Sequence, residues 1–573
     1  MKRITVLLCA LFVVIGAQAQ KKYTISGYVQ DVESGEHLIG VNVIWKEKML
    51  GTTTNTYGFY SITIPEGESE LVYSYIGFEK VVRKINLKED VRINIELNSS
   101  SADIAEVTVV GEETVVDRTQ SSVVDVSVKQ IKNIPALLGE VDVLKAIQLL
   151  PGVQSGGEGS SGFYVRGGGP DQNLILLDGV PVYNASHLFG FFSVFNADAI
   201  KNVRLTKGGF PARFGGRLSS VLEIDMKEGN MKKIEGEGSI GIVASKLTLQ
   251  GPIIKDKTSF IVSGRRTYID LLAQPLIKSM SDGDTGFGYY FYDLNAKLNH
   301  KFSEKDRLYL SAYTGNDRFY INESYTQGNY TDQMDMGLNW GNITSALRWN
   351  HLFSNKLFSN TTLTYSKYQF NTSMEMTEQF TDGDSEMRFG YFSGIEDYGA
   401  KIDFDYLPNP NHYIRFGANY TYHTFSPGAM DLYERFNTET VMDTSFNFSE
   451  TLYANESFLY VEDDIKINDQ LKVNIGLHAG GFYVKDKLYP SLQPRFSARY
   501  LVDKDWSIKA SYADMQQNIH LLSNTSSGMP TDIWVPSTDS VPSQHSRQVA
   551  ASINHTLGGG AFEISLEGYY KTM

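Results

Sequence analysis

Apolar and polar residues alternate with a period of two from about residue 232 to the end of the chain. In 471–480 the odd-numbered positions are apolar and the even-numbered ones are polar or glycine. The segments 413–422 and 506–513 alternate in the same way. This alternation is typical of a β-sheet with one apolar and one polar face. It predicts about fifteen antiparallel strands, the last of them over 561–570.

The connections between these strands are of two kinds. Short turns are expected at 255–257, 303–306, 354–356, 408–411, 468–470 and 503–505. Long polar loops are expected near 270–286, 321–336, 375–386, 428–451 and 516–544. Tight periplasmic turns and extended extracellular loops are the pattern of outer-membrane barrels. We therefore predict a transmembrane antiparallel β-barrel. Many of its strands exceed the roughly 9–11 residues that cross a bilayer.

Residues 21–98 have a different pattern, in which short β-prone runs are separated by turn residues. The runs are 23–29, 41–45, 58–64, 71–75 and 91–97. Short strands at this spacing are typical of a β-sandwich. We therefore predict an N-terminal β-sandwich ahead of the barrel.

Residues 99–229 carry signals for both helix and strand. An apolar run over 141–150 predicts a helix, which Pro151 and Gly152 end. Strand-like pieces occupy 174–177 and 203–206, and a glycine-dense run covers 156–169. Glycine allows positive φ where a chain turns tightly. The region is predicted to be a small α+β domain, so the whole chain is mainly β.

The N-terminus has the features of a secretory signal peptide. Lys2 and Arg3 precede an apolar stretch over 4–15, and small residues at 17–19 form a cleavage site. Cys9, the chain's one cysteine, lies inside this predicted signal peptide. The mature chain is therefore expected to lack thiols, disulfides and cysteine metal ligands.

Charge and motif content exclude several classes of protein. Removal of Lys2 and Arg3 lowers the formal net charge from −14 to −16, which disfavours nucleic-acid binding. No Gly-Lys-Ser/Thr follows the glycine runs, so a phosphate loop is not expected. The ten histidines show no metal-ligand spacing, and no Gly-x-Ser-x-Gly nucleophile motif occurs. We therefore expect no enzyme activity, no cofactor and no metal site.

Several motifs resemble the plug domain of TonB-dependent outer-membrane receptors. They are Val165-Arg166-Gly167 and the segments 173–181, 199–205, 211–217 and 219–222. The segments 51–54, 58–60 and 74–78 resemble the carboxypeptidase-regulatory-like domain that precedes such receptors in Bacteroidetes. The resemblance implies a plugged barrel of 22 strands. About fifteen are expected here, so the chain is interpreted as truncated at its C-terminus.

The resemblance implies a division of the chain into five parts. These are a signal peptide (1–19), a carboxypeptidase-regulatory-like sandwich (20–98), a linker with a TonB box (99–114), a plug domain (115–229) and an outer-membrane barrel (230–573). The sandwich and plug would lie on the periplasmic side or in the barrel lumen. An unpaired edge strand is costly in lipid, so we expect that this chain alone does not form a stable closed barrel.

The function implied is active import of a nutrient: a small chelate, a vitamin, a peptide or a glycan. A ligand would gate the plug, and the TonB–ExbB–ExbD energy complex would pull on it. The TonB box is assigned to Glu106, Val107, Thr108, Val109 and Val110, because an extended β-prone segment can add to a partner's sheet edge. Outer-membrane lipids are the other implied partner.

The residues that follow the box depart from one class of these receptors. Gly111-Glu112-Glu113-Thr114 stands where the glycan-importing class carries a Tyr-Gly pair and a basic run. This departure counts against glycan uptake and against a surface lipoprotein partner. Two alternatives to import also stay open at this point, a ligand-sensing signalling receptor and a surface adhesin barrel.

Candidate site residues come from the plug motifs. By position, the outward loops would present Asp171, Gln172, Tyr183, Asn184 and His187 to a hydrogen-bonded small ligand. The alternative is that these residues pack against the barrel wall. Three arginines are expected to seat the plug by pairing with wall carboxylates, because buried arginine is usually paired. They are Arg166, Arg213 and Arg217.

Overall fold

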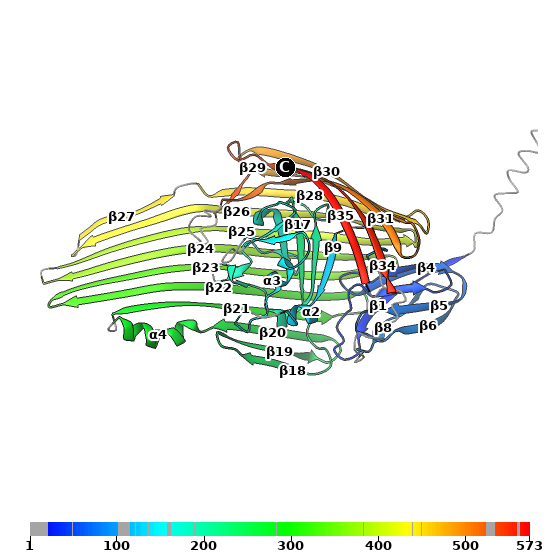
Figure 1. Cartoon of the computed structure of the whole chain (residues 1–573), viewed down its shortest axis with the longest axis horizontal. Helices are drawn as coiled ribbons and strands as arrows, with labels where there is room; N and C mark the ends of the chain where they lie inside the picture. The colour runs from blue at the N-terminus through cyan, green and yellow to red at the C-terminus, as the bar shows by residue number, and fades with distance from the viewer. Residues whose placement is uncertain are drawn as a thin grey trace, which may run out of the picture.

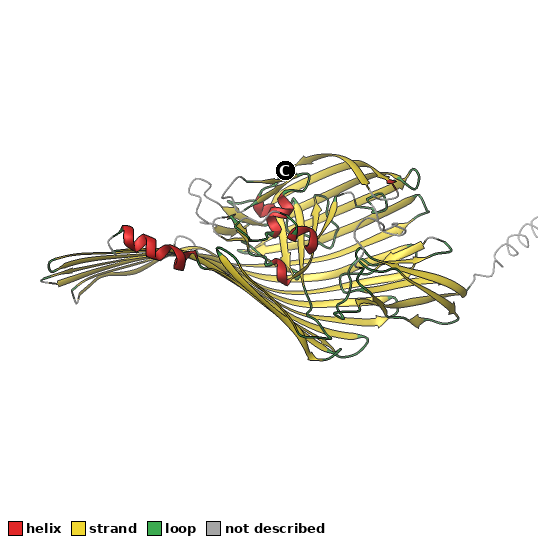
Figure 2. Cartoon of the chain, turned by 60° about the horizontal axis from the view of Figure 1, so that its bottom comes forward, coloured by secondary structure: helices red, strands yellow, loops and turns green. Residues whose placement is uncertain are grey.

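The computed structural model of the chain is shown in Figures 1 and 2. It describes residues 21–48, 50–100, 115–120, 122–134, 138–156, 162–187, 190–281, 284–381, 383–437, 439–447, 450–522, 533–558 and 562–573. The predicted signal peptide and the predicted TonB box lie outside these residues. No helix among the described residues is long and apolar enough to cross a membrane.

The N-terminal part is a sandwich of two small sheets. Its strands are β1 (Lys22–Asp31), β2 (Asn42–Trp45), β3 (Leu50–Thr53), β4 (Phe59–Pro65), β5 (Gly67–Ser74), β6 (Val81–Leu87), β7 (Val91–Arg92) and β8 (Ile95–Leu97). One sheet has the order β4-β1-β7, with β8 also paired to β1, and the other has the order β3-β2-β5-β6. Ile25, Val43, Ile64 and Leu71 are fully buried between them. The one strand expected over 91–97 is two short strands.

The plug is a mixed domain inside the larger sheet (Figure 1). Its elements are β9 (Val123–Ser127), α2 (Val128–Lys132), α3 (Val143–Gln148), β10 (Val153–Ser155), β11 (Phe163–Val165), η2 (Pro170–Gln172), β12 (Asn173–Leu177), β13 (Val180–Pro181), β14 (Ser186–His187), β15 (Phe192–Ser193), η4 (Ala197–Ala199), β16 (Ile200–Lys207) and β17 (Ser220–Met226). Five strands pair in the order β13-β12-β17-β16-β9. The Asp142 side chain caps α3 by accepting from the Lys145 amide at 2.8 Å.

A large antiparallel sheet, here called the wall, curves around the plug (Figure 2). Its strands are β18 (Glu235–Ile240), β19 (Ala244–Ile254), β20 (Thr258–Thr267), β21 (Thr285–Lys301), β22 (Asp306–Gln327), β23 (Tyr330–Ser354), β24 (Leu357–Phe380), β25 (Gly383–Asn409), β26 (His412–Phe436), β27 (Glu439–Asn447), β28 (Leu452–Lys466), β29 (Leu471–Val484), β30 (Lys487–Leu501), β31 (Trp506–Gln517), β34 (Gln544–Leu557) and β35 (Phe562–Thr572). These 16 strands pair in chain order from β18 to β35, with β27 beside β28 on β26. Within the described residues, β18 and β35 are the edge strands.

The outward face of the wall has an apolar band. On β23, the exposed side chains of Ile343, Leu347 and Trp349 belong to it. Above Ile343 the outward positions of the same strand are polar residues or glycine, such as Asp335 and Asn339. An outward apolar band of limited height is the lipid-contacting surface of an outer-membrane barrel.

Three of the segments expected to be long loops are strands. The segments 321–336, 375–386 and 428–451 lie almost wholly in the hairpins β22–β23, β24–β25 and β26–β27, which extend well past the plug (Figure 1). Of the other two, 270–286 contains helix α4 (Ile269–Met280), and 516–544 contains β32 (Ile519–Leu522) and β33 (Ile533–Pro536). The short turns occur where they were expected; Asp256, for example, has a φ of 58°.

Candidate functional site

Two of the three candidate seating arginines form ion pairs with the wall. Arg213 Nη1 lies 2.7 Å from Glu462 Oε1 on β28, and the Glu462 side chain is fully buried. Arg166 pairs with Glu567 on β35 and donates to the Ser122 hydroxyl. Its guanidinium also lies over the Tyr569 ring, 5.0 Å from the ring centroid. The two pairs join the plug to two separate strands in the second half of the wall, β28 and β35.

Arg217 differs from this expectation. It is buried, and its Nη1 donates to the Gly216 carbonyl at 2.8 Å. Its guanidinium lies 5.9 Å from the centre of the Trp534 ring on β33. Among the described residues, no carboxylate lies within ion-pair distance of it. Arg217 therefore contacts the wall side of the lumen through an aromatic ring and not through a carboxylate.

His187 is held between two carboxylates of the wall. Its Nδ1 lies 2.6 Å from Asp317 Oδ2 on β22, and its Nε2 lies 2.8 Å from Asp293 Oδ1 on β21. The ring stacks on Phe291 at 4.1 Å. All of these groups are buried, and Arg265 neutralises Asp293 from 2.5 Å. The β14 strand of the plug is thus fixed to the wall by a charged cluster.

The charge on His187 follows from this geometry. Burial lowers the pKa of the imidazole, but the Asp293 and Asp317 carboxylates outweigh burial and raise the pKa to about 9. At neutral pH the ring is therefore the imidazolium, and each ring nitrogen donates a hydrogen bond to one carboxylate.

Tyr183 and Asn184 also contact the wall. The Tyr183 hydroxyl donates to Asp397 on β25, and its ring packs edge-on against Trp534 at 4.9 Å. The Asn184 backbone carbonyl accepts from Asn342 Nδ2 at 2.6 Å. Both residues are buried. Together with His187, they therefore have the packing role that the sequence left open as an alternative to ligand binding.

Asp171 and Gln172 lie in η2, near the second half of the wall. The Asp171 carboxylate accepts from Gln517 Nε2 at 3.1 Å on β31. Gln172 Nε2 donates to Gln544 Oε1 at 3.1 Å on β34. Both residues are only partly buried. Of the five predicted ligand residues, these two keep solvent-accessible polar groups.

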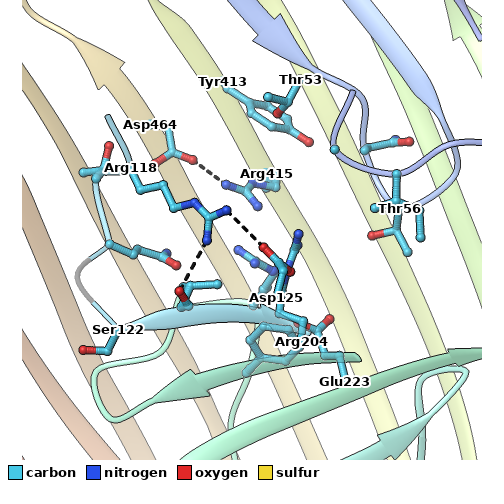
Figure 3. Close-up of a pocket in the computed structure, with 18 of the residues that line it drawn as sticks. Thr53, Thr56, Arg118, Ser122, Asp125, Arg204, Glu223, Tyr413, Arg415 and Asp464 are labelled. Carbon is cyan, nitrogen blue, oxygen red and sulfur yellow. Dashed lines mark hydrogen bonds and ion pairs between the residues drawn. The ribbon is translucent and has the colours of Figure 1, made fainter. Parts of the chain in front are cut away.

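A cavity of about 2200 Å³ separates the plug from part of the wall. Figure 3 shows side chains from three parts of the chain around it. They are Thr53 and Thr56 of the sandwich, Asp125, Arg204 and Glu223 of the plug sheet, and Tyr413, Arg415 and Asp464 of the wall. Its lining includes the short turns at 409–412 and 504–505. The cavity therefore reaches the edge of the wall that carries the short turns.

The cavity lining is charged and of mixed sign. Arg204 pairs with Asp125 at 2.6 Å, Arg118 with the same carboxylate at 3.3 Å, and Arg415 with Asp464. Burial raises the pKa of Asp225 on β17, and neighbouring carboxylates contribute, so that it reaches about 6. A surface of this kind favours water and hydrophilic solutes over apolar ones.

The turn between β3 and β4 of the sandwich enters the cavity from the short-turn side. Asn55 Nδ2 donates to Asp405 Oδ2 at 2.8 Å. The Tyr57 ring stacks on Phe358 at 5.5 Å and lies 5.4 Å from the Arg348 guanidinium. The sandwich therefore closes part of the opening at the short-turn end of the wall.

Neither the wall partners of the plug nor the sandwich turn stands out in the amino-acid sequence. Four carboxylates lie at inward positions of the wall strands, those of Asp293, Asp317, Asp397 and Glu462. Polar residues are expected at such positions in any case, because the lumen of a barrel is solvated. A wall carboxylate helps to hold the plug only where it faces a buried plug residue. The sequence does not show which residue it faces, because the two lie far apart in the chain. Tyr57 and Asn55 lie in an ordinary turn sequence.

Three protein families match successive parts of the chain. Residues 25–109 match the CarboxypepD_reg-like domain, and residues 106–220 match the TonB-dependent Receptor Plug Domain. Residues 276–573 match the TonB dependent receptor-like β-barrel, which is more than half of the chain.

Two curated relatives are TonB-dependent receptors of Formosa agariphila. One is 32% identical over 194 residues, which are 31% of this chain and 18% of the relative. The other is 31% identical over 226 residues, which are 38% of this chain and 20% of the relative. The matched part therefore spans about a fifth of the length of these relatives.

Solved structures share the fold at low identity. The siderophore receptor PirA from Pseudomonas aeruginosa has a TM-score of 0.52 and 16% identity, covering 78% of this chain and 74% of that one. P. aeruginosa FpvA, solved bound to heterologous pyoverdines, has a TM-score of 0.54 and 13% identity, covering 80% and 63%. At these identities the likeness concerns the fold alone.

Proposed function

The chain belongs to the TonB-dependent receptor family, and on that premise we propose that it serves the active import of a nutrient across the outer membrane. The observation that carries the proposal is a plug fixed inside the wall by charged contacts beside a hydrophilic cavity of about 2200 Å³. The cargo classes that remain are a small chelate, a vitamin, a peptide and a glycan.

The kind of contact that fixes the plug suits a domain that must move. The described contacts between plug and wall include ion pairs such as Arg213–Glu462 and hydrogen bonds such as Asn342–Asn184. When the interface opens, both partners of such a contact regain water together, which costs less than removing one partner and leaving the other buried. The apolar core of the plug, around Ile147 and Leu222, is made of plug residues apart from Tyr313 of the wall. The plug can therefore shift while its own core stays intact.

Energy for the movement would come from the TonB–ExbB–ExbD complex. The proposed contact is the box Glu106–Val110, between sandwich and plug and outside the described residues. An extended β-prone segment can add as a strand to the edge of a partner sheet. Pulling on this segment would act on β9, which begins at Val123 and pairs with β16 of the plug sheet.

The test of this proposal is binding to the periplasmic domain of the host's TonB protein. Thr108→Pro with Val109→Pro removes two adjacent backbone N–H groups, one on each side of an extended segment. Whichever side pairs, the strand is interrupted. We expect the purified wild-type chain to retain the TonB domain in a pull-down and the double variant to lose it.

The matched control is Ala102→Pro, which lies in the same linker but outside the box. It should leave retention unchanged. Equal retention by the box variant and the wild-type chain would contradict the proposed contact.

Import itself is tested by depletion of compounds from defined growth medium, followed by mass spectrometry. Cells with the wild-type chain should deplete at least one compound that cells with the box variant leave behind. An adhesin barrel would predict equal depletion and unchanged surface attachment. A surface lipoprotein partner, against which the residues after the box count, would reveal itself by co-purifying with the wild-type chain.

A further inference from the structure

Methionines are concentrated in the part of the wall that extends beyond the plug. Of the 15 methionines in the chain, seven lie between residues 334 and 442. They are Met334, Met336, Met374, Met376, Met387, Met430 and Met442. Two of the segments read Met-Asp-Met (334–336) and Met-Glu-Met (374–376), which puts both methionines of each segment on one face of a strand.

Strand register places five of these side chains next to one another. Met334 of β23 is directly opposite Met376 of β24, and Met376 is directly opposite Met387 of β25. In the neighbouring row, Met336 is directly opposite Met374. Directly opposed residues have Cβ atoms about 4.5–5.5 Å apart. The five thioethers therefore form one array over three strands.

The array faces the lumen above the plug. Leu338 and Trp340 on β23 pack in the same cluster as Tyr183 of the plug. Met334 and Met336 precede them at even spacing, so they lie on the same face. Met334, Met336, Met374 and Met376 are half-buried, and Met387 is 43% exposed. The sulfur atoms are thus on a surface that a solute entering from outside can reach.

The row that contains three of the methionines is flanked by carboxylates. Glu323 of β22 is directly opposite Met334, and Glu434 of β26 is directly opposite Met387. The face therefore combines soft sulfur donors with negative charge at both ends of one row. Apolar contact alone would not require sulfur or flanking carboxylates, since leucine covers similar area.

Thioether sulfur is a ligand for soft metal ions. Methionine and cysteine select Cu(I), whereas oxygen donors suit hard cations. No group of three or more His, Cys, Asp or Glu side chains within the described residues is arranged to hold a metal. The donors that this face does offer to a metal ion are the methionine sulfurs, with Glu323 and Glu434 at the ends of one row. We propose that the array formed by Met334, Met376 and Met387, with Met336 and Met374 beside it, binds a soft monovalent cation such as Cu(I).

The proposal concerns binding and does not depend on transport. It is tested on the purified full chain with Ag(I), a soft monovalent probe, and with Cu(I) in competition with a colorimetric chelator. The variant carries Met334→Leu, Met376→Leu and Met387→Leu, which keep the volume and apolarity of each site. We expect the affinity for Ag(I) and Cu(I) to fall at least about tenfold. Loss of a group that only orients a metal ligand already weakens a metal site by that factor.

The control carries Met280→Leu and Met573→Leu, two exposed methionines outside the array. It should bind Ag(I) as the wild-type chain does. Unchanged binding by the triple leucine variant would overturn the proposal, as would equal weakening in the control. A wild-type chain that does not bind either ion would also overturn it. The substituted methionines lie on β23, β24 and β25 and not in the proposed box at 106–110, so we expect an unchanged TonB pull-down, and the two proposals fail independently.

Discussion

At the scale of single residues, His187 is one of the plug residues that contact charged groups of the wall. Its two ring nitrogens contact Asp293 and Asp317, and its pKa is raised to about 9. The ordinary pKa of histidine is about 6.5. A pKa raised in the folded state means that the protonated ring stabilises that state. The contribution is complete below about pH 6.5 and is lost as the pH rises through about 9.

We predict that His187→Gln removes this pH dependence. Glutamine can still hydrogen-bond to one carboxylate but does not titrate. In detergent, the thermal midpoint of the wild-type chain should exceed that of the variant most clearly near pH 6, and the difference should narrow by pH 9.5. A difference that widens with pH would show that the imidazolium is not the stabilising form.

Arg213 and Arg217 make a matched pair for testing how the plug is seated. Arg213→Met leaves the buried Glu462 with Arg415, 3.1 Å away, as its remaining cation. We expect a loss of about 2 kcal/mol in the free energy of unfolding, below the 3–5 kcal/mol for a buried charge left alone. Arg217→Met removes the Trp534 contact and the hydrogen bond to the Gly216 carbonyl but strips no buried carboxylate of a cation, so it should cost less, about 1 kcal/mol. Denaturant unfolding in detergent measures both.

The outcome for these arginines also shows what sequence can and cannot give at this scale. Their positions in a plug motif made burial and pairing a reasonable expectation. Arg213 meets Glu462, which is 249 positions away in the chain. Arg217 is only four positions from Arg213, yet it meets Trp534. Which partner each arginine finds depends on how the wall curves, and no local pattern encodes that curvature.

At the scale of elements, the period-two alternation located the strands of the wall but not their full length. The segments 321–336, 375–386 and 428–451 are rich in polar residues, which favours a loop interpretation. In the structure these segments still alternate, but here the apolar side chains face inward and the polar ones face outward. Met334 and Met336 point inward, and Asp335 points outward. A strand leaving the bilayer no longer needs an apolar outer face. Polarity alone therefore cannot separate such strands from loops.

A protease test separates strand from loop in one of these segments. Arg435 is the single basic residue in the three segments. It lies on β26 and pairs with Asp384 and Glu386 of β25. We predict that limited trypsin digestion of the folded chain leaves the bond after Arg435 intact.

The matched site is Lys504, whose side chain is 89% exposed in the short turn before β31. Trypsin should cut there first, as mass spectrometry of the fragments would reveal. Early cutting after Arg435 would support the loop interpretation and contradict the paired hairpin.

At the scale of the whole molecule, the sandwich is joined to the wall by contacts that sequence does not reveal. Asn55 and Asp405 are 350 positions apart, and Ser61 donates to the Asn355 carbonyl at 2.6 Å across 294 positions. The sandwich, the plug and the wall were each predicted as separate units. Their arrangement depends on surface complementarity, because the turn at Asn55–Tyr57 is ordinary in composition.

We predict that Asn55→Cys with Asp405→Cys is cross-linked by a short, reducible bis-methanethiosulfonate reagent, because the two native side chains are in hydrogen-bond contact at 2.8 Å. The background is clean, because the one native cysteine lies in the predicted signal peptide. A mobility shift on a non-reducing gel, reversed by dithiothreitol, is the expected result. Each single-cysteine variant should show no shift. Failure of the pair to cross-link with this reagent would contradict the docking of the sandwich.

The height of the β22–β27 hairpins has a consequence for what the cell surface presents. On β23 the strand continues from Ile343 to Tyr330, about 40 Å at roughly 3.4 Å per residue, or about 30 Å of height at a tilt near 45°. In the expected orientation, with the short turns on the periplasmic side, bacteriophage and antibodies would therefore meet these hairpin tips before any part of the bilayer. The turn at Gly328, whose φ is 63°, is consequently a place where an inserted epitope would be displayed on intact cells.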